Sequence, residues 1–572
     1  MIRRKGKLSS PTASVATVAR PVLPSLAYRK HASRNRGKLN KQRISQFIAS
    51  RLFVGCIVVP IFILALLHRS SKVQKLEGEI EHLAEKEVLR IEQFAGDLAQ
   101  EETPSLRKRF GNVATNAERS FLHALLGDNS KMFQNKIAHD ESKGKEMLSQ
   151  DSSNAQNGGV KYYMVFSTGC SVFQNWQSYT FFYHAMKVKQ PGEIIRIASG
   201  CKDEEAAALR KEHNEKIKIM SDNFHLHITP DFSGPKKYYY YNKPFGLRHW
   251  LEHYLGYPNK KDADDAIIML LDPDQMLLRP LTHDFTGTNT IYLKEDGVKP
   301  KTKVEHGTPF ATNYMFGAQP FTKVNTTKIA GKSSMIQKVS KKDQVNHYPA
   351  GPPYLATARD MYRIVVTWTD FVPLVHAQYP HLLAEMYAYC LAAAHWNKPH
   401  QLVPSLMISD VHAPDHGAEG WELLDKYSNE RMCEPFDQKD LPFVLHYCQN
   451  YWLGKWFVGK YRLHKDFYSC DAPLFKDPPK DVGAKYDYYI KPGAPKATYG
   501  QRVPMKFTNH RKRSAFMLCH LIPALNEVAT WYKDHHCKKG KANYQKTYVF
   551  HKDMDPDKNN YTNYGPNEFP PQ

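Results

Sequence analysis

Asp272 and Asp274 flank a proline directly after the apolar run AIIMLL at residues 266–271. Two carboxylates separated by one residue, at the exit of a rigid strand, both present oxygen to a hard divalent cation such as Mn²⁺ or Mg²⁺. The remaining coordination positions of such a cation are free for phosphate oxygens and water. A D-x-D pattern is expected about once by chance in a chain of this length, and Asp-Pro-Asp also suits a turn. The weight of the motif therefore depends on the elements around it.

These elements predict a parallel α/β sheet. Strands separated by helices of ordinary length form βαβ units, whose strands are buried on both faces. Ligands of such sheets bind beyond the carboxyl ends of the strands, which points to Ser167 and Thr168 as well as to the two aspartates. The expected strands are 162–167, 193–198, 224–229 and 266–271, and the expected helices are 175–187, 204–220 and one opened by Pro244.

The absence of two nucleotide-binding motifs limits the reactions in which the acidic pair could take part. The chain has no G-x-x-x-x-G-K-[ST] loop, and no G-x-G-x-x-G follows the first strand, so a diphosphate must be held by a metal and by side chains. A sugar that leaves from UDP needs its departing diphosphate neutralised, which a carboxylate-bound cation does as a Lewis acid. We therefore expect a nucleotide-sugar transferase rather than a kinase or nucleotide hydrolase. Lys243 and Arg248 are candidates to face the diphosphate, although solvated surface positions explain them equally well.

Composition excludes a disordered chain and weakens a nucleic-acid function. The 572 residues are 42% hydrophobic, which is enough to build one or more large cores. The net charge is +22, but residues 1–51 hold thirteen Lys and Arg and no Asp or Glu. The rest of the chain is only modestly basic, so we expect no nucleic-acid partner.

The basic segment leads into a predicted transmembrane anchor at residues 52–68. Its first sixteen residues carry no charge, and Arg51 and Arg69 flank it. Such a span is short for a hydrocarbon core of ~30 Å, but flanking arginines snorkel and early secretory membranes are thinner. The cations before it predict a single-pass type II protein with a cytosolic tail (1–51) and a catalytic domain in the Golgi or ER lumen. Alternatives are a core helix, a signal-peptide region, or an organellar transit peptide over residues 1–43.

The remaining regions are expected to be a helical stem and linker (69–159), a catalytic domain (160–478) and a C-terminal extension (479–572). The apolar positions of the stem cover two heptads, which is too few for a coiled coil, so a plain spacer is favoured over a stem-mediated dimer. The extension is basic and Tyr-rich, with a helix expected near 514–535.

Eight cysteines follow the predicted span, and an even number is what a disulfide framework in an oxidising lumen requires. Cys170 and Cys201 follow strands that should be neighbours, so this pair is the one we most expect to be bonded. The other short loops would join Cys433 with Cys448, or Cys519 with Cys537.

Aromatic-rich segments in the second half would ordinarily be core, but together with the earlier motifs they resemble a known family. The matching stretches lie between about residues 160 and 475. They include FSTGCSVFQNWQSYTFFYH, YYNKPFGLRHWLEH, IIMLLDPDQMLLRPL, GPPYLATARDMYRIVVTWTDF and LPFVLHYCQNYWLGKWFVGKY. The chain is similar to the plant and algal peptidyl serine α-galactosyltransferases and, more distantly, to the hydroxyproline O-arabinosyltransferases.

The resemblance implies a GT-A-like fold in the Golgi or ER membrane. It also implies transfer of a sugar, galactose above all, from a UDP-sugar to Ser or hydroxyproline of a secretory or cell-wall glycoprotein. Asp272 and Asp274 match its metal and diphosphate motif, and His446 in LHYC matches a C-terminal metal ligand. A neutral imidazole completes a shell acceptable to Mn²⁺. The alternative is that His446 is a core histidine of an aromatic strand.

Glu385 and Asp410 are the candidate catalytic carboxylates. Glu385 interrupts an otherwise apolar helix, LLAEMYAYCLAA, which rarely buries a charge without a reason. In an inverting enzyme it would deprotonate the acceptor hydroxyl, and in a retaining enzyme it would position the acceptor or stabilise the oxocarbenium-like state. Asp410 in MISD is the second candidate. Two other functions stay open: transfer of another sugar such as arabinofuranose, and a binding module without transfer activity.

Overall fold

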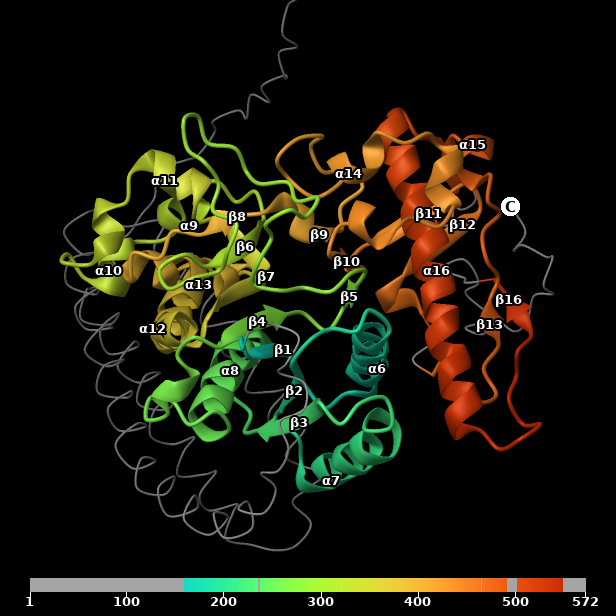
Figure 1. Ribbon diagram of the computed structural model, residues 1–572, viewed down its shortest axis with the longest axis horizontal. Helices are drawn as coiled ribbons and strands as arrows, with labels where there is room; N and C mark the ends of the chain where they lie inside the picture. Colours follow the sequence, from blue (N-terminus) through green and yellow to red (C-terminus); the bar gives the residue numbers. More distant parts are fainter. Residues whose placement is uncertain (1–158, 235–236, 464–465, 491–501, 549–572) are drawn as a thin grey trace, which may run out of the picture. The chain divides into compact units, whose positions relative to one another are not determined.

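The computed structural model describes residues 159–234, 237–463, 466–490 and 502–548 (Figure 1). The predicted tail, membrane anchor and nearly all of the stem lie outside these residues. Within the described part, no helix combines the length and the apolar character that crossing a bilayer requires.

A seven-stranded sheet, in the order β3-β2-β1-β4-β7-β6-β8, forms the centre of the described part (Figure 1). Its first four strands are parallel: β3 (Phe224–Thr229), β2 (Glu193–Ser199), β1 (Tyr162–Thr168) and β4 (Ile267–Leu271). Beyond β4 the sheet is mixed: β7 (Ala350–Thr357) runs antiparallel to both of its neighbours, β4 and β6 (Phe310–Asn313), and a short β8 (Gln401–Leu402) pairs parallel with β6. The predicted α/β class and its four parallel strands are therefore confirmed, and the antiparallel strand β7 joins them to β6 and β8.

Helices cover both faces of this sheet, which is why its inner strands β1 and β4 lack polar alternation. Tyr163 and Val165 of β1 share an apolar cluster with one set of helices, whereas Met164 and Phe166 share a second cluster with the opposite helix. The first set is α8 (Asn242–His253), α12 (Ala358–Gln378) and α13 (Ala384–His395), and the opposite helix is α6 (Val172–Lys187). The helix predicted at 204–220 is shorter, since α7 (Asp203–Glu212) passes into a π-helical turn (His213–Ile217).

A third apolar cluster gathers around the long helix α16 (Thr508–His536), coloured red in Figure 1. It includes residues of a small sheet, β5 (Gln275–Leu277), β10 (Val444–His446) and β9 (Met407–Ile408), and of the hairpin β11 (Asn450–Leu453) and β12 (Trp456–Gly459). The helix predicted near 514–535 is therefore confirmed, and its apolar side shares one core with residues that precede position 479.

Short elements complete the described part. They are α9 (Gln319–Thr322), α10 (Thr326–Ala330), α11 (Lys341–Asn346), α14 (Glu422–Asp425), α15 (Val482–Lys485), β13 (Leu474–Phe475), β14 (Tyr488–Ile490), β15 (Arg502–Pro504) and β16 (Lys546–Thr547).

Three disulfides cross-link the described part of the chain. The predicted Cys170–Cys201 bond is confirmed, with a Cα–Cα distance of 5.3 Å. The two other short-loop pairs were wrong, because the structure contains Cys433–Cys519 and Cys470–Cys537 instead. Cys519 and Cys537 lie at the middle and just past the end of α16, so a rise of ~1.5 Å per residue keeps them far apart. Cys390 and Cys448 are free.

Non-reducing peptide mapping of the purified chain should recover three linked pairs, Cys170–Cys201, Cys433–Cys519 and Cys470–Cys537, with free thiols at Cys390 and Cys448. Cys519→Ser should lower the free energy of unfolding by roughly 2–5 kcal/mol, because it opens a long loop in the unfolded chain. Cys390→Ala is the matched control, since it removes a buried thiol without breaking a disulfide. A linked Cys433–Cys448 peptide would contradict this arrangement.

Candidate metal centre

The Asp272-Pro273-Asp274 segment is both a turn and an acidic pair. β4 is buried on both faces, with residues at most 2% exposed, and it ends at Leu271. Gln275 closes the turn: its backbone N–H donates to the Asp272 carbonyl (3.1 Å), and its side-chain carbonyl accepts from the Asp272 N–H (2.9 Å). The turn and cation interpretations are therefore compatible, because this turn holds both carboxylates at the carboxyl end of the central sheet.

His446 reaches the acidic pair through strand pairing. β5 begins directly after Asp274 and pairs antiparallel with β10, which sets His446 opposite Gln275. His446 Nε2 lies 3.2 Å from Asp274 Oδ2. Ligand atoms of Asp272, Asp274 and His446 all lie within 4.8 Å of one another. The three residues predicted as metal ligands are thus brought together.

This donor set fits a divalent cation. Two carboxylates and one imidazole are ligands that Mn²⁺ accepts, and the carboxylates also suit Mg²⁺. Asp274 and His446 are 4% and 7% exposed, whereas the side chain of Asp272 is 20% exposed. The cluster is therefore closed around Asp274 and opens toward Asp272, where phosphate oxygens or water would complete the coordination.

Two lysines neutralise the pair. Lys243 Nζ lies 2.8 Å from Asp272 Oδ1 and 3.5 Å from Glu385 Oε2, and Lys460 Nζ contacts Asp274 Oδ2. Burial alone would lower the pKa of each lysine, but the carboxylates more than offset it and raise the pKa. Both ammonium groups are charged at neutral pH. Lys243 was predicted from its place beside a helix start, whereas nothing local in GKYRLH singled out Lys460.

Asp274 and His446 also shift each other's pKa. Burial would raise the pKa of Asp274, but His446 and Lys460 hold it well below its usual range. Burial would lower the pKa of His446, yet Cys448 and Asp274 raise it well above its usual range. The imidazole here acts as a counter-ion of Asp274, and since a ligating imidazole is neutral, cation binding would release a proton.

Glu385 lies directly behind Lys243. It is 2% exposed in the first turn of α13, and its Oε1 has no hydrogen-bond partner among the described residues. Burial raises the pKa of Glu385 to about 7, while Lys243 opposes the rise and Asp272 adds to it. The predicted helix and the burial of its carboxylate are confirmed. Lys243 contacts both Glu385 and Asp272, so it connects this carboxylate to a candidate metal ligand.

Tyr314 is a neighbour of the acidic pair that the sequence analysis missed. Burial raises the pKa of Tyr314 well above its usual range, and the nearby carboxylate of Asp272 adds to the effect. The ring lies against Gly351, where an added Cβ would fall 1.9 Å from Tyr314 Cδ2. A glycine inside the strand segment GPPYLA was the available signal, because strand glycines mark close approaches.

Ser167 and Thr168 lie at the end of β1, which pairs with β4 and so ends beside Asp272. The hydroxyl of Thr168 is engaged within the fold: it donates to the Ile197 carbonyl (3.2 Å) and accepts from Arg196 Nε (2.9 Å). Thr168 is 3% exposed, whereas Ser167 is half-buried. Of the two, Ser167 is the one with accessible surface near the acidic pair.

Arg248 contacts its own helix and α12. Its Nε donates to Glu252 Oε1 (2.9 Å) and its Nη1 donates to Thr369 Oγ1 (3.1 Å). These contacts favour the structural interpretation of Arg248 over a contact with a diphosphate.

Asp410 follows β9, which pairs parallel with β10 and therefore ends near His446. Its backbone N–H donates to Glu419 Oε2 (3.0 Å), and its carboxylate accepts from the His412 N–H (2.9 Å). Glu419 is a buried carboxylate that the sequence analysis did not single out, and it also accepts from Ser409. No contact joins Asp410 to the acidic pair among the interactions of the described residues.

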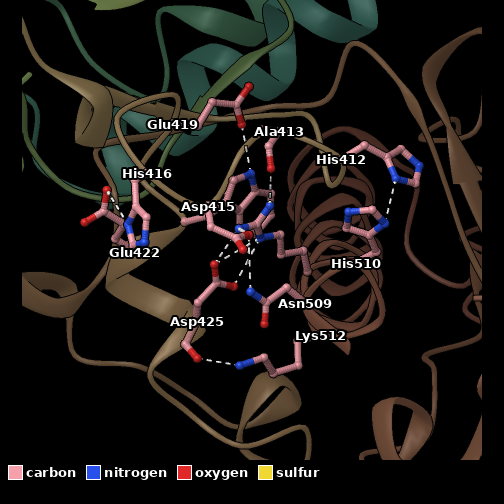
Figure 2. A network of polar contacts seen from close by, with 12 residues as sticks. His412, Ala413, Asp415, His416, Glu419, Glu422, Asp425, Asn509, His510 and Lys512 are labelled. Carbon is pink, nitrogen blue, oxygen red and sulfur yellow. Dashed lines mark hydrogen bonds and ion pairs between the residues drawn. The ribbon is translucent and has the colours of Figure 1, made fainter. Parts of the chain in front are cut away.

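The loop after Asp410 is clamped to α16 (Figure 2). Arg513 of α16 is 1% exposed, and its Nη2 lies 2.5 Å from Asp425 Oδ2 and 2.8 Å from Asp415 Oδ1. His510 and His412 meet at 3.0 Å between their Nδ1 atoms. The segment after position 479 thus holds the loop that follows Asp410 in place.

Two curated proteins match this chain, and both bear the name peptidyl serine alpha-galactosyltransferase. The protein from Arabidopsis thaliana is 23% identical over 345 residues, which cover 57% of this chain and 34% of that protein. The protein from Chlamydomonas reinhardtii is 24% identical over 304 residues, covering 49% of this chain and 38% of that protein. The chain is homologous to these enzymes. It spans about a third of their length, and no protein-family profile matches it.

The stability of the chain should report the unusual state of Glu385. Its folded pKa of about 7 exceeds the ordinary 4.5, so the folded state binds more protons between these values and stability falls as pH rises through them. Glu385→Gln removes the titrating carboxyl group and therefore this loss of stability with rising pH. Between pH 4.5 and 8 its free energy of unfolding should gain roughly 1–3 kcal/mol relative to the unsubstituted chain. Urea unfolding at both pH values measures this, with exposed Glu204→Gln as control. An equal pH dependence in both variants would contradict it.

Arg513→Met should destabilise the chain by roughly 3 kcal/mol, because it leaves Asp425 without its buried partner. Thermal melting of this variant beside Lys506→Met, which removes an exposed charge of the same segment, measures the difference. If both variants have the same melting temperature, the ion pairs of Arg513 contribute nothing to the stability of the fold.

Proposed function

We propose that this chain is a metal-dependent glycosyltransferase of a GT-A-like fold. It transfers a sugar, galactose in the first place, from a UDP-sugar to the hydroxyl of Ser or hydroxyproline in secretory or cell-wall proteins. The observation that carries the proposal is the cluster of Asp272, Asp274 and His446 at the carboxyl end of a parallel-rich sheet. The names of the two homologues support it independently.

Each charged residue of the cluster has a proposed task. Asp272, Asp274 and His446 would hold a divalent cation, which when bound supplies Lewis-acid neutralisation of a departing diphosphate. Lys243 presents a fixed positive charge beside Asp272, where it stabilises phosphate oxygens. Glu385 holds this lysine from behind, and its pKa of about 7 suits a group that exchanges a proton near neutral pH. Asp410 remains the second candidate carboxylate.

The cellular setting belongs to the same proposal. Acceptors of the secretory pathway require a luminal enzyme, and residues 52–68 would anchor the chain in the Golgi or ER membrane with residues 1–51 in the cytosol. Three disulfides in the described part agree with an oxidising compartment. Hydroxyproline O-arabinosyl transfer is the alternative activity, and a binding module without transfer activity is the other.

Sugar transfer from UDP-galactose to a Ser-containing and a hydroxyproline-containing peptide, across a Mn²⁺ titration, tests the proposal. Asp274→Asn should lower the transfer rate by roughly 100-fold or more, because one buried ligand of the cation loses its charge. The variant should still fold but melt at a lower temperature, because buried Lys460 and His446 lose their charged partner. Asp262→Asn, an exposed aspartate before β4, is the matched control.

Transfer that survives both EDTA and Asp274→Asn would remove the metal from the mechanism. A parallel donor panel with UDP-arabinofuranose separates the galactosyl from the arabinosyl activity. UDP release without transfer to either peptide, from any donor, would contradict a protein O-glycosyltransferase.

A further inference from the structure

The acidic pair contacts two lysines, Lys243 and Lys460, which differ in the number of carboxylates that each contacts. Lys243 has two carboxylate partners, Asp272 and the buried Glu385. Glu385 is outside the proposed metal-ligand set, so it keeps its hold on Lys243 whatever binds Asp272. Lys243 contacts Asp272 Oδ1, which leaves Oδ2 of that carboxylate for another ligand.

The carboxylate partner of Lys460 is Asp274, which is itself one of the three proposed metal ligands. Its ammonium contacts Asp274 Oδ2, the same oxygen that His446 Nε2 approaches at 3.2 Å. A divalent cation that takes Asp274 Oδ2 and His446 Nε2 as ligands would lie against these same two atoms. Two cations on one carboxylate oxygen repel each other strongly in a buried setting, so the ammonium and the metal compete for this position.

Lys460 follows a closely packed hairpin, and its side chain lies beside an exposed aromatic ring. Lys460 begins the short 3₁₀ turn after β12, and the preceding Gly459 lies so close to Asn450 that an added Cβ would fall 2.0 Å from Asn450 Oδ1. The Lys460 ammonium already lies 4.7 Å from the ring centroid of Tyr461, which is 66% exposed. Tyr461 stacks on Phe173 at 5.5 Å. A turn of the side chain toward this aromatic surface would take the ammonium away from Asp274.

We propose that Lys460 is a tethered cation that occupies the metal position between turnovers and moves to the donor diphosphate when metal and nucleotide bind together. This inference rests on the proposed function for the identity of the nucleotide. Its consequence is positive coupling between the two ligands. The metal displaces an ammonium, and the diphosphate gives that ammonium a new partner.

The test uses the purified full-length chain and two probes, Mn²⁺ and UDP. Electron paramagnetic resonance of free Mn²⁺ gives the Mn²⁺ affinity with and without saturating UDP, and calorimetry gives the UDP affinity at saturating Mn²⁺. In Lys460→Met, Mn²⁺ alone should bind several-fold more tightly, because its competitor is gone. UDP at saturating Mn²⁺ should bind roughly 10-fold more weakly, because one charged contact to the diphosphate is lost.

Lys439→Met is the matched control, since its side chain is 77% exposed and it carries the same charge outside the cluster. It should leave both affinities unchanged, and melting temperatures of both variants confirm folding. Weaker or unchanged Mn²⁺ binding in Lys460→Met would overturn the exchange, and so would unchanged UDP binding. The absence of any Mn²⁺ binding by the unsubstituted chain would overturn it too. If the expected shifts occur but no hydroxyl accepts a sugar, the exchange stands and the proposed function fails.

Discussion

The antiparallel pairing of β5 with β10 is the contact on which the rest of the site depends. It continues the chain from the acidic turn directly into a second small sheet, and its register sets His446 beside Asp274. The same small sheet includes β9, which leads into the Asp410 loop. The hairpin that follows β10 ends at Gly459, directly before Lys460. One register therefore positions ligands, counter-ion and loop together, and a one-residue slip would turn His446 to the opposite face.

Charge compensation is the second constraint. Three carboxylates of low exposure lie close together, and an unpaired buried charge is strongly destabilising. Lys243 serves two of these carboxylates and Lys460 serves the third. This balance explains why Glu385 is tolerated in an apolar helix. It also means that the side chains of the cluster hold one another in place, so that its charged groups are already oriented.

Local signals carried most of what was predictable from the sequence. Apolar runs identified β1 and β4, because burial on both faces removes polar alternation. The spacing of strands and helices identified β2 and β3, although Arg196 interrupts β2 and histidines alternate along β3. The neighbouring ends of β1 and β2 identified the Cys170–Cys201 bond. His446 came from the family resemblance alone, and Lys460 and Tyr314 were missed. Their contacts are set by pairing between segments far apart in the chain, which no local pattern of charge or hydropathy encodes.

The dependence of this core on α16 limits how the chain can be shortened. A recombinant fragment that ends at residue 478, the predicted end of the catalytic domain, would remove every residue of α16 from the shared core. Cys433 and Cys470 would become single thiols, and a large apolar surface would be open to aggregation. Soluble production of this part of the chain therefore calls for a fragment that extends at least through Cys537.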